Sequence, residues 1–168
     1  MRITLDSCTI ILLAKASVLE IVIDSYDIII TKDVYKEVVK GKEKSFQDAL
    51  LLERFGELKK FKQINTDAKL TKKLVKDFNM GLGEASVISF AIKQKYCVIA
   101  TDNRQGRKAA KINNIPLVGS IEIVVALFKN KKITSEKAVT ALKILRIAGW
   151  FDDYLIENAM EAVKNERN

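Results

Sequence analysis

Histidine is absent from this chain of 168 residues. Its absence excludes Ser-His-Asp and Cys-His catalysis, histidine general bases and the usual zinc enzymes. Any hydrolytic chemistry must therefore come from carboxylates, lysines, hydroxyl groups or a metal ion held by oxygen ligands.

Cysteine and long apolar runs are also scarce. Cys8 and Cys97 are the only two cysteines, too few for a disulfide framework and without a metal-site pattern. Their apolar neighbours predict that both are small buried side chains. No segment has the apolar length of a membrane span. The chain starts directly with the strand-like MRITLD rather than a signal peptide. We therefore expect a cytoplasmic protein with no membrane contact.

Positive charge is abundant, with a formal net charge of +8. A basic surface attracts polyanions such as RNA, although lysine-rich surfaces also serve solubility alone. The hydrophobic content of 48% is sufficient for a full core, and the length suggests one domain of ordinary size.

Short apolar runs alternate with helical patterns along the chain. Strands are predicted at 1–5, 27–30, 97–100 and 116–118, and 61–64 is either an edge strand or a connector. Helices are predicted at 7–14, 17–26, 32–41, 44–55, 66–79, 104–113, 121–129, 135–148 and 152–165, with one more beginning near Gly81. This alternation favours a parallel sheet, whose strands end at one common edge.

Four carboxylates stand out by position. Asp6 and Asp102 each follow a predicted strand directly. Glu37 and Glu84 lie on helices that should cover the same sheet, and Glu43 is a weaker candidate nearby. Each acid also has an ordinary interpretation, such as a lysine-paired acid on a helix flank or an acid at a helix start.

Acids that gather at one edge repel one another, and a bound cation relieves the repulsion. Oxygen ligands without histidine or cysteine suit Mg²⁺ or Mn²⁺. Such a cation beside a basic rim is suited to phosphodiester cleavage, because the metal activates water and stabilises the leaving oxygen.

The same acids carry a resemblance to the PIN-domain nucleases. MRITLDSCTIILLAK resembles their opening motif, with Asp6 as the first acid. TKDVYKEVV and GLGEASVISFA resemble the second and third motifs, with Glu37 and Glu84. VIATDNRQGRKAA resembles the fourth, with Asp102. The resemblance covers roughly residues 1–128, and four motifs in the same order are fairly specific.

This resemblance implies a three-layer α/β/α fold with a short, mainly parallel sheet. It implies a nuclease domain at 1–130 and a C-terminal helical pair at 131–168 packed on the same domain. The implied activity is that of a Mg²⁺- or Mn²⁺-dependent endoribonuclease cleaving single-stranded RNA, often the toxin of a toxin–antitoxin pair and often dimeric. The four acids would be both catalytic residues and metal ligands.

Several other residues are assigned secondary roles. Ser7 and Asn103 are helpers, and position 103 is Asn where many relatives carry Asp, which reduces the negative charge available to a second metal. The predicted contacts to RNA phosphates come from one basic helix: Arg104, Arg107, Lys108 and Lys111.

The aromatic residues near the C-terminal hinge are interpreted as packing residues. Trp150, Phe151 and Tyr154 follow helical spacing and do not alternate with basic residues, so a base-stacking platform is disfavoured. With Leu155 and Ile156, they predict packing on the domain or on another chain.

Three alternative functions are compatible with parts of the sequence. GLGEAS resembles the dinucleotide fingerprint but lacks a preceding strand. Aspartyl-nucleophile phosphatases need a second Asp where this chain has Cys8. A catalytically weak PIN-like scaffold that binds RNA or protein is the stronger alternative, and metal-dependent cleavage that EDTA blocks would distinguish it from a nuclease.

Overall fold

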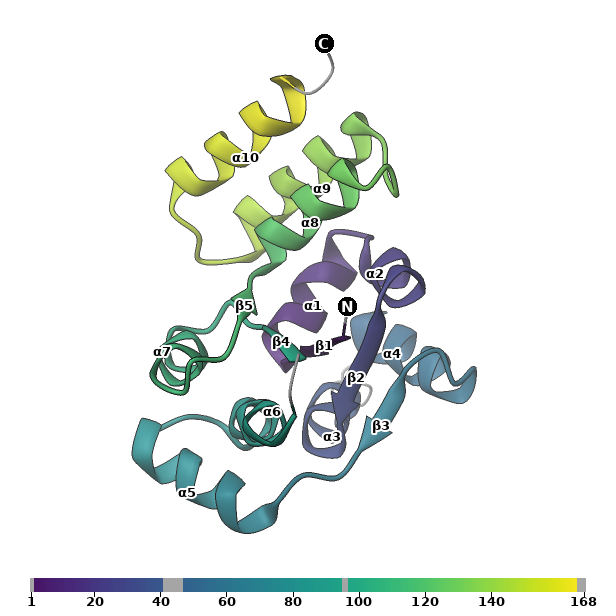
Figure 1. The fold of residues 1–168 in the computed structure, drawn as a ribbon. Helices are drawn as coiled ribbons and strands as arrows, with labels where there is room; N and C mark the ends of the chain where they lie inside the picture. The colour runs from purple at the N-terminus through teal and green to yellow at the C-terminus, as the bar shows by residue number, and fades with distance from the viewer. Residues whose placement is uncertain (1, 41–46, 95–96, 166–168) are drawn as a thin grey trace.

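A parallel sheet forms the centre of the molecule in the computed structural model, which describes residues 2–40, 47–94 and 97–165 (Figure 1). The strands of these ranges are β1 (Arg2–Leu5), β2 (Asp27–Thr31), β3 (Lys62–Ile64), β4 (Cys97–Ala100) and β5 (Leu117–Val118). They lie in the order β3-β2-β1-β4-β5, and every pairing is parallel. The predicted α/β fold is confirmed, and segment 61–64 contributes an edge strand.

Helices cover both sides of this sheet. The helices of the described ranges are α1 (Ser7–Lys15), α2 (Leu19–Ser25), α3 (Lys32–Val39), α4 (Gln47–Glu57), α5 (Ala68–Phe78), α6 (Leu82–Lys93), α7 (Arg104–Ile112), α8 (Ser120–Lys129), α9 (Ser135–Ala148) and α10 (Asp153–Asn165). In Figure 1, α8, α9 and α10 lie on one side of the strands, and α5 and α6 lie on the other. Helix α6 contacts β1, β2 and β4, and α5 packs outside it.

The strands are nearly continuous apolar runs because both faces of the sheet are covered. Ile3, Leu5, Ile30 and Ile99 are each at most 1% exposed. The register pairs Leu5 of β1 with Ala100 of β4. The residues that follow these two strands therefore meet at the same carboxyl edge of the sheet.

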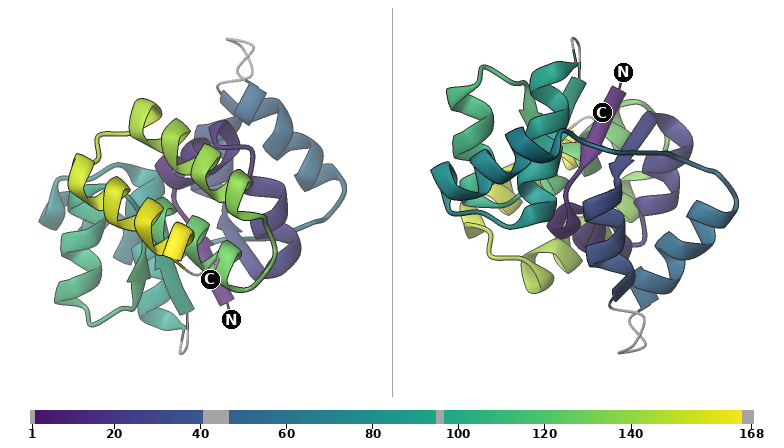
Figure 2. Two further views of the ribbon diagram at one scale, coloured as in Figure 1. Left: turned by 90° about the horizontal axis from the view of Figure 1, so that it is seen from above. Right: turned by 90° about the horizontal axis from the view of Figure 1, so that it is seen from below.

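The C-terminal helices belong to the same hydrophobic core. Helices α8, α9 and α10 pack on one another, and α1 contacts both α8 and α9. Leu142, Leu145, Ile156 and Val163 are fully buried, but Trp150 is 106% exposed. The two views of Figure 2 show the α9–α10 hairpin packed along the body of the molecule. Ile156 packs within the chain, whereas Trp150, Tyr154 and Leu155 are exposed, so for these three only packing on another chain stays a prediction.

Other local expectations differ from the structure. Helix α4 continues through Gly56, where the Tyr35 ring packs closely against the glycine. Cys8 is exposed because it begins the outer face of α1, while Cys97 is buried as predicted. Glu43 lies outside the described residues. Within the described ranges, no helix is long and apolar enough to cross a membrane.

Candidate active site

Asp6 and Asp102 are joined by a single threonine at the carboxyl edge of the sheet. Asp6 begins α1 as its N-cap, and its Oδ1 accepts a hydrogen bond of 2.8 Å from the backbone N–H of Thr9. The Thr9 hydroxyl donates to Oδ2 of Asp102 at 3.1 Å. One residue in the first turn of α1 thus orients both carboxylates that follow the central strands.

The Asp6 carboxylate is only partly satisfied by the protein. The residue is 1% exposed, and its Oδ2 has no hydrogen-bond partner among the described residues. Burial raises the pKa of Asp6 to about 6, the polar groups of Thr101 and Thr9 oppose the rise, and the charge of Asp102 adds to it. A buried carboxylate oxygen without a donor normally requires an explanation, such as an ion that binds there.

Asp102 is held by the start of α8. The backbone N–H of Ser120 donates to both of its oxygens, at 3.0 and 3.2 Å. Burial raises the pKa of Asp102, these hydrogen bonds lower it, and the nearby charge of Glu122 raises it further. Asp102 therefore sits between a helix N-terminus, which favours its negative charge, and a second carboxylate, which does not.

Glu84 reaches the same edge of the sheet from α6, which covers the face opposite α8 (Figure 1). It lies in the first turn of α6, where its Oε2 accepts a hydrogen bond of 3.3 Å from the backbone N–H of Gly81. Glu84 and Asp6 line one narrow crevice together with Thr101 and Gly106. Burial raises the pKa of Glu84, and the charge of Glu37 adds to the rise. Glu84 is thus both a helix-capping acid and part of an acidic crevice.

Glu37 completes the set from α3, and Gly83 gives it space. A β-carbon added at Gly83 would collide with the Glu37 carboxylate and lie 3.1 Å from the Ser7 hydroxyl. The Ser7 hydroxyl is buried and has no hydrogen-bond partner among the described residues. Glu37 itself is exposed, so its carboxylate reaches over the glycine from the solvent side.

A hydrogen bond links the start of α3 to α6. The hydroxyls of Thr31, which caps α3, and Ser86 of α6 are 2.6 Å apart and buried. Ser86 donates its single hydroxyl proton to the carbonyl of Gly83 at 2.6 Å, so Thr31 is the donor in the hydroxyl pair. This chain of hydrogen bonds fixes Gly83 in register with the start of α3 and therefore holds Glu37 beside Glu84.

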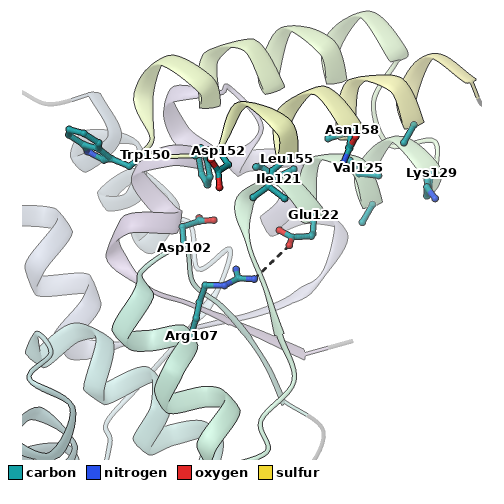
Figure 3. Close-up of a pocket in the computed structure, with 14 residues that line it drawn as sticks. Asp102, Arg107, Ile121, Glu122, Val125, Lys129, Trp150, Asp152, Leu155 and Asn158 are labelled. Atoms are coloured by element: carbon teal, nitrogen blue, oxygen red, sulfur yellow. Dashed lines mark ion pairs between the residues drawn. The ribbon is translucent and has the colours of Figure 1, made fainter.

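The predicted helper and phosphate-contact residues fall into two groups. Asn103 caps α7, with its Oδ1 accepting from the N–H groups of Gln105 and Gly106. Arg107 donates to the Thr101 carbonyl at 3.2 Å and pairs with Glu122 at 3.9 Å (Figure 3). The other three basic residues of α7 are exposed: Arg104, Lys108 and Lys111. Arg107 and Asn103 thus have structural contacts, whereas the other three face solvent.

The four predicted acids form two linked pairs. Thr9 joins Asp6 to Asp102, and Gly83 lies between Glu37 and the α6 start that carries Glu84. Asp6 and Glu84, one acid from each pair, also line the same crevice, which has no room for a water molecule. In residues 2–40, 47–94 and 97–165, no three acids or cysteines are arranged closely enough to hold a metal ion. The site is an acidic cluster in which each pair is oriented separately.

Three residues of this site were missed in the sequence. Thr9 stands three residues after a capping Asp, a spacing that predicts only its backbone hydrogen bond. Gly83 and Glu122 are both near helix starts, and the GxxE spacing of Gly119 and Glu122 could have indicated a capping acid beside Asp102. No spacing in the sequence indicates that Glu37 packs against Gly83.

A parallel α/β sheet with buried carboxylates at its carboxyl edge defines a class of proteins that bind ligands at that edge, often through cations. The particular family follows from a family model described as PIN domain, which matches residues 2–165. The chain therefore belongs to the PIN domain family, whose members are nucleases, and the resemblance found in the sequence is confirmed.

Among solved structures, the chain is similar to VapBC2 from Rickettsia felis, solved bound to a DNA fragment from the promoter. The identity is 20%, the match covers 71% of this chain and 98% of the other, and the TM-score is 0.48. No match was found among curated proteins.

Proposed function

We propose that this PIN-domain protein is a Mg²⁺- or Mn²⁺-dependent endoribonuclease that cleaves single-stranded RNA. Asp6, Glu37, Glu84 and Asp102 are its catalytic and metal-holding acids. The observation that carries the proposal is the buried Asp6 carboxylate, whose Oδ2 has no donor among the described residues and which lies beside two further acids of raised pKa.

The oxygen atoms of the site are chemically suited to bind Mg²⁺ or Mn²⁺. The site offers carboxylate and hydroxyl oxygens, and the Oδ2 of Asp6 and the Oγ of Ser7 are buried without hydrogen-bond partners among the described residues. Hard oxygen donors suit Mg²⁺ and Mn²⁺. When bound, the cation would polarise the phosphoryl oxygens and acidify a water molecule.

The residues of the chain would then have distinct tasks. Thr9 keeps the Asp6 and Asp102 carboxylates in fixed orientations, so both can hold the same ion once Asp6 has lost its proton. Glu37 of α3 and Glu84 of α6 add two more carboxylates to the site. Ser7 can donate a hydrogen bond to a water or a phosphate oxygen, and Asn103 supports the site by capping α7.

The biological setting is part of the same proposal. We infer a cytoplasmic toxin that is held inactive by an antitoxin protein, and a homodimer is compatible with the exposed apolar side chains of the tail. The direct test is cleavage of a labelled single-stranded RNA with Mn²⁺ and with EDTA. Cleavage that needs the cation and is lost in Asp102→Asn supports the nuclease. An RNA-binding protein that leaves the strand intact under both conditions would be a scaffold.

Gly83→Ala is expected to reduce cleavage without reducing stability. The new methyl group would push aside the Glu37 carboxylate, which is the flexible end of a long side chain. Replacing a helical Gly with Ala stabilises a helix by up to about 1 kcal/mol, which offsets the local crowding. A displaced catalytic group costs on the order of a hundredfold in rate. Cleavage rates and thermal melts of the variant measure both effects.

Gly81→Ala is the matched control for this variant. Gly81 is at the N-cap of the same helix, and a β-carbon added there meets nothing within 4 Å. Its cleavage rate should stay close to that of the wild type. Equal losses in both variants would show that the helix start, rather than the space for Glu37, is what matters.

Neutralising Lys108 and Lys111 to Gln should weaken RNA binding and reduce its dependence on salt. Each lost phosphate contact should lower the slope of log K against log salt by about 0.7 for a single strand. The control is Lys137→Gln with Lys143→Gln on α9, which removes the same charge from another exposed face. Electrophoretic or fluorescence binding measured at several salt concentrations provides the slopes. Equal slopes for the two double variants would indicate a general charge effect.

A further inference from the structure

A cleft between α8 and α10 opens beside Asp102. It has a volume of about 650 Å³, within the size range of small-molecule sites (Figure 3). Its walls are mainly apolar, with contributions from Ile121, Val125, Phe151 and Leu155. Leu155 is 51% exposed although it lines a cavity. The cleft is therefore an apolar site that nothing in the described chain fills.

A second groove of opposite character meets this cleft at Asp102 and Arg107, which line both. The second groove has a volume of about 810 Å³ and follows α7, where Arg104, Lys108 and Lys111 line it. The α7 groove is mainly basic, with Asp102 as its one acid. The α8–α10 cleft is mainly apolar and has charges of both signs at its rim, with Lys129 and Arg107 beside the acids Asp102, Glu122 and Asp152.

We propose that the α8–α10 cleft receives one unpaired nucleobase of the RNA while the α7 groove holds the phosphates of the same strand. This inference rests on the proposed nuclease function and adds the position of a base to it. A single strand is itself divided into an anionic backbone and neutral aromatic bases, which matches the two adjoining grooves. An apolar protein segment could fill the cleft but would leave the basic groove beside it without a role.

The polar groups in the cleft suit the edge of a base. Glu122, Asp152 and Asn158 line it together with the apolar side chains. Every nucleobase has at least one N–H donor on its pairing edge, and carboxylates and amides accept such hydrogen bonds. Phe151 and Leu155 offer surfaces for the faces of the ring. Trp150 is fully exposed at one end of the cleft (Figure 3), so an adjacent base can stack on it, contrary to the packing role that its helical spacing predicts.

Titration calorimetry in EDTA tests the proposal without any cleavage. The ligands are the four ribonucleoside 5′-monophosphates, and the control ligand is ribose 5-phosphate, which has the phosphate and the sugar but no base. The nucleotides are expected to bind clearly more tightly than ribose 5-phosphate. Equal binding of both would place all recognition in the basic groove and overturn the proposal.

Two matched variants locate the base. Leu155→Ser removes an apolar wall of the cleft and should weaken nucleotide binding about tenfold. Ile147→Ser makes the same kind of change on the same tail, at a residue that is 87% exposed and does not line the cleft. It should bind nucleotides like the wild type. Melting curves verify that both variants are folded, and binding by Leu155→Ser equal to that of the wild type would overturn the assignment.

Trp150 provides a spectroscopic signal because it is the only tryptophan of the chain. Its emission should be quenched by a short RNA that includes bases, and much less by ribose 5-phosphate. If instead Leu155→Ser changes the oligomeric state while nucleotides do not bind, the cleft is a protein interface. Binding in EDTA is independent of catalysis, so a loss of nuclease activity and a failure of the base site give different results.

Discussion

Asp6→Asn is expected to melt at a higher temperature than the wild type in EDTA at neutral pH. The wild-type carboxylate is buried, and its Oδ2 has no donor among the described residues. Asparagine is uncharged, and its oxygen can still accept the capping hydrogen bond from Thr9. The same variant should lose cleavage by more than about a hundredfold, because even the loss of groups that merely orient metal ligands costs about 10- to 100-fold.

The dependence on pH has a definite sign. The pKa of Asp6 is about 6 in the folded protein, against an ordinary value of 3.8. Between these values the folded protein holds a proton that the unfolded chain has released, so stability falls as pH rises. Above about pH 6 the cost is complete and of the order of 3 kcal/mol, an upper bound on the gain from Asn. Below about pH 4 the variant and the wild type should converge.

Asp67→Asn is a matched control of opposite sign. Asp67 also caps a helix, accepting from the N–H of Leu70 at 3.0 Å, but its side chain is 33% exposed and pairs with Lys93. The Lys93 hydrogen bond lowers the pKa of Asp67 to about 2. Removing this charge should lower the melting temperature at neutral pH. If both variants melt lower in EDTA, Asp6 is an ordinary helix cap.

The positions of Asp6 and Asp102 could be predicted because they depend on a simple rule. Each follows a strand, and the carboxyl ends of parallel strands share an edge. The paired register of Leu5 and Ala100 fulfils that rule. The start of α6 near Gly81 was predictable for a similar reason, since glycine and a following acid indicate a helix start.

The contacts between elements could not be predicted. The approach of Glu37 to Gly83 depends on how α3 is oriented against α6, which a buried hydroxyl pair of Thr31 and Ser86 determines. Ile92 follows the buried Ile88 by four residues, a helical spacing that puts both on one face of α6, yet Ile92 is 41% exposed because it lies near the end of the helix. Local patterns specify which face of an element is apolar, but not how far the neighbouring element extends over it.

Mn²⁺ or Mg²⁺ is expected to raise the melting temperature of the wild type near neutral pH. A ligand present at 100 times its Kd stabilises the folded state by about 2.7 kcal/mol. The effect should decline as pH falls through about 6, because protons compete for Asp6, and for Glu84 and Asp102, whose pKa values are also raised. Thermal melts with Mn²⁺ and with EDTA at several pH values measure this difference.

Glu84→Gln separates a metal ligand from a helix cap. Burial and the charge of Glu37 raise the pKa of Glu84, so the neutral variant should melt higher than the wild type in EDTA. It should gain less from Mn²⁺, because one ligand is weakened. Glu122→Gln is the control, since Glu122 also accepts a hydrogen bond from a glycine N–H at a helix start, at 3.0 Å for Gly119. That variant should keep most of the gain from Mn²⁺.

The opposite pattern would assign Glu84 to the helix alone. A Glu84→Gln protein that melts lower in EDTA, and gains as much from Mn²⁺ as the wild type, has lost a capping acid of ordinary pKa. The hydrogen bond from Gly81 would then account for the residue, as it does in any capping box. The two roles predict opposite signs in EDTA because a cap stabilises the folded protein through its charge, whereas a metal ligand in an acidic crevice destabilises it until the cation binds.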